Sequence, residues 1–207
     1  MGAIFLVLLC LCAGPVHAFE RNETKLTPCI RAALPGETAA QMLNPAIAFD
    51  CSGKQSKYPS GNYWVRLDPH GERSPRDDPM FFRTPNLWSD GFTLDFFYAD
   101  GTRSTVYAPA ATMSKRIKLG ALIEIRVPRS NVPIDAIVAR IENAGNARGI
   151  MIAAALVPQS QSIRDERNLA ALYAGVAGLF IALLAYNLAL WRGMRQRFQI
   201  IYCLMLV

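Results

Sequence analysis

Residues 169–191 form an uninterrupted apolar stretch toward the C-terminal end of the sequence. The stretch contains no Asp, Glu, Lys, Arg, His or Pro, and it has about the 20 residues that a helix needs to cross the hydrocarbon core of a bilayer. The alternative is a buried helix of a soluble protein, which is normally shorter and carries one polar face. The pattern predicts a transmembrane helix, so the lipid bilayer is the first expected partner.

The charges on either side of this stretch predict its orientation. Residues 192–197 after it contain three bases and no acid, whereas residues 164–167 before it contain two bases and two acids. Short loops rich in Arg and Lys stay in the cytoplasm, so the basic loop is predicted to be cytoplasmic and everything before the helix to lie outside. The residues that set this topology are Arg192, Arg195 and Arg197.

The sequence becomes apolar again at residues 198–207, which have about half the length of a span. This indicates the beginning of a second transmembrane helix, truncated at Val207. The chain is therefore expected to be the front part of a larger polytopic protein.

Small residues follow one side of the predicted helix at intervals of four, three, four, three and four. Helices in lipid associate by close backbone approach along small residues, so this seam predicts packing against further helices of the same receptor or a homodimer partner. Chance is the alternative, because alanine is common in such helices. The seam consists of Ala171, Gly175, Gly178, Ala182, Ala185 and Ala189.

Residues 1–18 resemble a secretory signal, with an apolar core at residues 4–12 and compact residues before the expected cleavage site after Ala18. No Lys or Arg precedes Arg21, so the usual basic head is missing. Half of the net charge of +6 comes from the basic loop, which leaves the exported part only mildly basic. It contains no charge run of the kind that binds nucleic acid.

The exported part reads as β-sheet. Alternating runs at residues 62–67, 92–98, 102–108 and 122–127 are bounded by turn signals, and Asp100-Gly101 predicts a hairpin. Further strands are expected at residues 116–119, 134–142 and 150–157, with one short helical candidate at residues 38–43. The predicted fold is mainly β: a periplasmic β-sandwich at residues 58–160, then a linker at residues 161–168.

Five cysteines are present, and only Cys29 and Cys51 fall in the exported part. In an oxidising compartment such a pair predicts a disulfide, which would tie an N-terminal extension, residues 19–57, onto the sandwich. Two free buried thiols are the alternative. Two thiols and one histidine provide too few ligands for zinc, and no metal or cofactor is expected.

The stretch from Asp68 to Pro85 reads as a long polar loop. Its carboxylates at Asp68, Glu72, Asp77 and Asp78 suit calcium, but no spaced calcium-loop pattern is present and the interleaved arginines favour a solvated loop.

Enzymatic activity has little support in the exported part. It contains no Gly-x-Ser-x-Gly elbow. A glycosidase pair drawn from Asp90, Asp95 and Glu124 is the remaining enzymatic alternative, although the strand pattern places Asp95 and Glu124 on outward-facing positions. The chain is therefore not expected to be an enzyme.

Aromatic residues near the sandwich edges could stack on a sugar or another small molecule, or they could belong to the core. The candidate ligand-binding residues are Trp64, Arg66 and Trp88.

Several motifs together resemble the bacterial seven-transmembrane receptors with diverse intracellular signalling modules. Residues 173–190, the basic loop and Tyr202 look like the first helix and loop of this family, and residues 63–66, 100–101, 114–117 and 123–127 look like its jelly-roll extracellular domain. The polar loop and the cysteine pair depart from the pattern, so no ligand site is carried over. The resemblance implies a sensor whose output, a diguanylate cyclase or a histidine kinase, is absent from this chain, and the cyclase is favoured.

The expected function is periplasmic sensing of a small molecule or carbohydrate, coupled to an intracellular output by repacking of the inner-membrane helix. The competing hypothesis is a membrane-tethered carbohydrate-binding module without signalling. That alternative needs only one helix, and the second apolar run argues against it.

Overall fold

The computed structural model describes residues 23–52, 55–85, 88–145 and 149–194. The predicted signal peptide, Arg195, Arg197 and the second apolar run lie outside the described residues.

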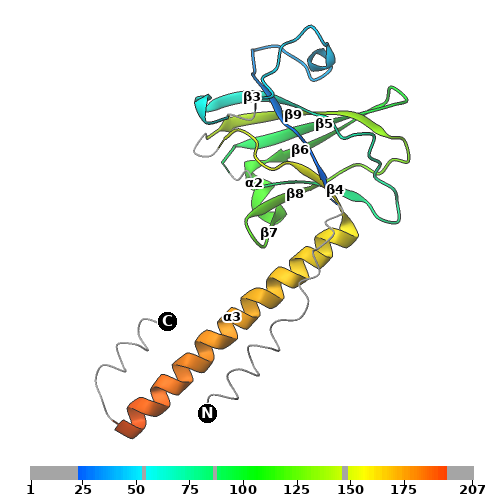
Figure 1. Cartoon of the computed structure of the whole chain (residues 1–207). Helices are drawn as coiled ribbons and strands as arrows, with labels where there is room; N and C mark the ends of the chain where they lie inside the picture. The colour runs from blue at the N-terminus through cyan, green and yellow to red at the C-terminus, as the bar shows by residue number, and fades with distance from the viewer. Residues whose placement is uncertain (1–22, 53–54, 86–87, 146–148, 195–207) are drawn as a thin grey trace.

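Two five-stranded antiparallel sheets pack face to face, with one long helix leaving them (Figure 1). The first sheet, sheet A, has the strand order β1 (Thr24–Lys25), β10 (Ala155–Pro158), β4 (Met80–Thr84), β8 (Leu122–Arg126) and β7 (Ile117–Lys118). The second, sheet B, has the order β2 (Cys29–Ala32), β3 (Gly61–Leu67), β9 (Ile134–Ala144), β5 (Gly91–Tyr98) and β6 (Arg103–Pro109). This arrangement confirms a mainly β, sandwich-like fold.

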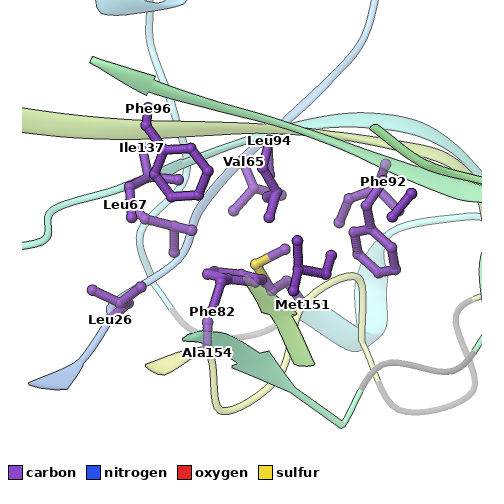
Figure 2. Close-up of a cluster of buried hydrophobic side chains, with 14 of the residues drawn as sticks. Leu26, Val65, Leu67, Phe82, Phe92, Leu94, Phe96, Ile137, Met151 and Ala154 are labelled. Carbon is purple, nitrogen blue, oxygen red and sulfur yellow. The ribbon is translucent and has the colours of Figure 1, made fainter. Parts of the chain in front are cut away.

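The main core lies between the two sheets and is filled by alternate strand residues, as a two-residue period requires. Figure 2 shows side chains of sheet B, such as Phe92, Leu94 and Phe96, meeting Phe82 of sheet A and Met151 from the segment before β10. The β5–β6 hairpin turns at Gly101, whose φ of 81° favours glycine, and the Asp100 carboxylate accepts a hydrogen bond of 2.9 Å from the Thr102 backbone N–H.

The N-terminal extension belongs to the sandwich and is not a separate appendage. It supplies β1 at the edge of sheet A and β2 at the edge of sheet B, and the Cys29–Cys51 disulfide is formed. Residues 33–49, which include the 3₁₀ turn η1 (Gln41–Leu43), then cover part of the outer face of sheet B. Their apolar side chains pack on Trp64 and form a second, smaller core.

The prediction of an irregular polar loop from Asp68 to Pro85 was wrong at its end, because residues 80–84 form β4, the middle strand of sheet A. Four of the five residues of β4 are buried, since its inner face meets the core and its outer face lies under a helix. Such a strand lacks the alternation that marks a half-solvated one. The strand expected at residues 150–157 is shorter and begins at Ala155.

The helix α3 (Gln159–Met194) follows β10 directly and contains the whole predicted transmembrane segment. Residues 161–168, expected to be a linker, form its first turns, so the connection between sandwich and span is helical. At 1.5 Å per residue, its 36 residues extend about 54 Å. From 159 to 193 the helix is long and apolar enough to cross a membrane. Three short elements, the helix α2 (Ala110–Met113) and the 3₁₀ turns η2 (Gln55–Lys57) and η3 (Ser114–Arg116), complete the described part of the fold.

Candidate functional site

The start of α3 is fixed to sheet A by the polar loop that precedes β4. The Asp78 carboxylate accepts hydrogen bonds from the backbone N–H and the hydroxyl of Ser160, at 2.9 and 2.8 Å. The Gln159 N–H donates to the Pro79 carbonyl at 2.9 Å. A carboxylate at a helix N-terminus satisfies backbone donors that have no partner within the helix and complements the helix dipole. The acidic loop therefore holds the helix at a set position on the sheet.

A buried ionic network joins sheet A to α3. Arg83 of β4 and Glu124 of β8 are direct neighbours across the two strands, and both point away from the main core toward the helix. The Arg83 guanidinium donates to Glu124 Oε1 at 2.8 Å from Nε and to Asp165 Oδ2 at 2.7 Å from Nη1. The Ser162 hydroxyl lies 2.9 and 2.7 Å from the two Glu124 oxygens. Two strands and two helical turns thus share one set of hydrogen bonds.

Burial makes this network sensitive to the loss of any partner. The side chains of Arg83 and Glu124 are only 10% and 3% exposed, while that of Asp165 is 30% exposed. Burial by itself would lower the pKa of Arg83, but the hydrogen bonds and charges of Asp165 and Glu124 outweigh it and raise that pKa. Arg83 therefore stays charged and needs both carboxylates.

A cleft of about 700 Å³ lies beside this network, between sheet A, the β7–β8 hairpin and α3. Lys118 of β7 forms an ion pair of 2.9 Å with Glu166 of α3 along its wall. Both apolar and charged side chains line the cleft. The apolar lining includes Leu26, Pro85, Leu119, Leu122, Leu169 and Leu172, and the charged lining includes Glu23, Lys25, Arg83, Lys118, Glu124, Asp165 and Glu166.

The candidate ligand residues predicted from sequence do not line this cleft. Trp64 is 3% exposed beneath residues 33–49, and its indole N–H donates to Glu37 at 3.1 Å. Arg66 stacks its guanidinium over the Phe49 ring, 4.8 Å from the centroid. Trp88 is 64% exposed, on the loop before β5. Trp64 is therefore a core residue, which was the alternative to ligand binding, and the three candidates do not form one site.

The carboxylates considered for hydrolysis do not converge. Asp95 and Glu124 do point away from the main core, as expected, but they lie on the opposite outer faces of the two sheets, and both are buried. Asp95 accepts hydrogen bonds from Arg103 at 2.7 and 2.9 Å, and Asp90 accepts one from Asn143 at 3.0 Å. Among the described residues, no three His, Cys, Asp or Glu side chains gather closely enough to hold a metal ion.

All six residues of the small-residue seam lie on α3 and are exposed in this chain. A Cβ added at Gly175 or Gly178 would meet no atom within 4 Å. Arg192 is the one topology-setting arginine within the described residues, and it is exposed in the last turn of α3.

The buried network of Arg83, Glu124, Ser162 and Asp165 forms a junction between sheet A and α3. Sequence reasoning missed this junction because its residues are far apart in the chain. Arg83 fell within the presumed loop, and Asp165 was counted only as a charge flanking the membrane. A usable signal was present in both strands: Arg83 follows Met-Phe-Phe, and Glu124 sits between two isoleucines. A charged residue within an apolar run indicates a buried partner.

Protein-family models, curated proteins and solved structures were each compared with the chain, and none matches it. The resemblance to seven-transmembrane receptors therefore rests on its sequence motifs alone.

Proposed function

We propose that this chain is the N-terminal sensory and membrane portion of a bacterial transmembrane signalling receptor. In this proposal the sandwich, a jelly-roll-like sensor domain, lies in the periplasm, and α3 crosses the inner membrane. The intracellular output, a diguanylate cyclase by preference or a histidine kinase, lies outside this chain.

The observation that supports the proposal most strongly is the continuity of α3. The same helix carries Ser162 and Asp165 in the buried network and the apolar residues 169–191. No flexible segment separates them, so a shift of the helix against sheet A also moves the membrane segment. A signal requires two arrangements that a ligand binds with different affinity, and the junction can provide them.

The cleft is the place where a small molecule would act on both parts at once. It is lined by sheet A, the β7–β8 hairpin and α3 together. A carbohydrate or small amphiphile bound there would contact strand and helix residues, so its binding energy would depend on their relative position. This mixed lining supports the cleft as the ligand site in preference to Trp64, Arg66 and Trp88.

The seam supports the second half of the mechanism. Its glycines and alanines are exposed along α3, where they suit close packing against another helix. Ligand-dependent movement at the junction would then change that packing and the output joined to it.

The proposal is tested in a chimera that carries a dimerisation-dependent reporter domain after the chain. Gly178→Leu fills the seam, and Ala177→Leu adds the same side chain about 100° around the helix. We expect Gly178→Leu to change the reporter signal and Ala177→Leu to leave it near that of the parent. Equal signals from all three would contradict the packing mechanism and favour a passive membrane tether.

A further inference from the structure

The β7–β8 hairpin lies beside the point where the predicted span begins. The Lys118 ammonium pairs with Glu166, and the backbone of Gly120 packs so closely on α3 that an added Cβ would lie 3.1 Å from Leu169 Cδ2. In Figure 1 this hairpin is on the side of the sandwich from which α3 departs.

This position sets the depth of the hairpin relative to a bilayer. Glu166 and Leu169 are about 4.5 Å apart along the helix axis, at 1.5 Å per residue. The interfacial layer on each side of the hydrocarbon core is about 5–8 Å thick. Because α3 is continuous and two contacts hold the hairpin to it, the hairpin must lie within this layer when residues 169–191 span the membrane.

The side chains of this region suit such a layer. Ile117 and Leu119 are 44% and 42% exposed although both are large and apolar, and Leu119 also borders the cleft. The chain has no acid between Asp100 and Glu124, while Lys115, Arg116 and Lys118 are all basic. Since Glu166 neutralises Lys118, the charges that remain to face outward are those of Lys115 and Arg116. Exposed apolar side chains next to bases are the composition of a surface that binds anionic lipid.

We propose that the β7–β8 hairpin is a second membrane contact of this protein, seated in an anionic phospholipid surface. Ile117 and Leu119 enter the headgroup layer, and Lys115 and Arg116 bind lipid phosphates. This contact fixes the tilt of the sandwich over the bilayer, which the helix alone leaves free. The inference rests on α3 crossing the membrane and is independent of any signalling output.

The test uses the full chain, with Cys10, Cys12 and Cys203 replaced by serine, in nanodiscs with or without phosphatidylglycerol. An environment-sensitive NBD dye is attached at Leu119→Cys. Two reference positions are labelled separately: Ala182→Cys in the span, and Asn131→Cys in the exposed loop after β8.

We expect the dye at 119 to emit at shorter wavelength than at 131 and to be quenched by lipids that carry a nitroxide at the headgroup. Emission at 119 equal to that at 131, with the dye at 182 in hydrocarbon, would overturn this inference and leave the proposed function intact. An aqueous dye at 182 would overturn both. A shifted dye at 119 that lipid quenchers do not reach would mean protein covers the hairpin, which also contradicts the proposal.

Charge reversal tests the choice of lipid. Lys115→Glu with Arg116→Glu should abolish the extra quenching at 119 that phosphatidylglycerol causes. Arg126→Glu with Arg129→Glu reverses two exposed bases at the opposite end of β8 and should leave that quenching unchanged. Equal quenching with and without phosphatidylglycerol in the parent protein would refute the role of the anionic headgroup.

Discussion

Replacing Arg83 by methionine should be one of the most damaging single changes in the sandwich. The change removes both hydrogen-bonded links to Glu124 and Asp165 and leaves the Glu124 carboxylate, only 3% exposed, with the Ser162 hydroxyl as its remaining partner. Breaking a buried ion pair from one side costs about 3–5 kcal/mol, because the other charge is left buried without compensation. The variant should lose that much of its free energy of unfolding at pH 7.

Two further variants separate this cause from a simple loss of packing. Glu124→Gln should cost less, because Asp165 still pairs with Arg83 and the amide still bonds Ser162. The double variant, Arg83→Met with Glu124→Met, should be more stable than Arg83→Met alone, since no buried charge remains unpaired.

The thermal unfolding of these variants can be followed by tryptophan fluorescence in detergent. Trp64 is buried and reports the sandwich, while Trp88 and Trp191 are already exposed when the protein is folded. If Arg83→Met melted at the temperature of the parent, or if the double variant were less stable than Arg83→Met, the assigned role of the network would be refuted.

Three other changes give graded tests of the fold. Hydrogen bonds from Lys57, the larger cause, and from Tyr58 hold the pKa of Asp50 well below its usual 3.8. The charged form of Asp50 therefore stabilises the protein above about pH 4, and this contribution is lost as the pH falls through the lowered pKa. Melting curves from pH 7 to pH 2 should therefore show the parent and Asp50→Asn converging in acid, and a constant gap would contradict the ion pair. Ala121, at a φ of 59°, occupies the left-handed region, so Ala121→Gly should raise the free energy of unfolding by about 1 kcal/mol in the same melts, and a loss would contradict the turn. Replacing Cys29 and Cys51 by serine should cost about 3 kcal/mol, matched by the parent under reducing conditions, whereas an unchanged melt would exclude a stabilising disulfide.

The local signals in the sequence predicted the strands that alternate apolar and polar residues or end in clear turns. The alternation at residues 62–67 became β3, and Asp100-Gly101 marked the turn between β5 and β6. The disulfide followed from counting the cysteines of a segment predicted to be exported, and the apolar stretch became part of α3.

The parts that escaped prediction depend on contacts between distant residues. β4 is buried on both faces because α3 covers it, and Arg83 meets Asp165 across 82 positions. The position of Trp64 depends on residues 33–49 folding back over sheet B, which no local pattern indicates. The continuity of α3 through residues 161–168 was missed because this segment is rich in charged residues, which is typical of a solvated linker. Its ion pairs with sheet A, which explain those charges, cannot be read from the sequence.

The orientation of α3 is the claim on which the functional account depends most directly, and a pair of fusions after Arg197 measures it. One fusion carries alkaline phosphatase, which is active only outside the cytoplasm, and the other carries a green fluorescent protein that fluoresces only inside. The account predicts a membrane-bound chain with an inactive phosphatase and a bright fluorescent fusion. An active phosphatase, or a chain that stays in solution without detergent, would contradict it.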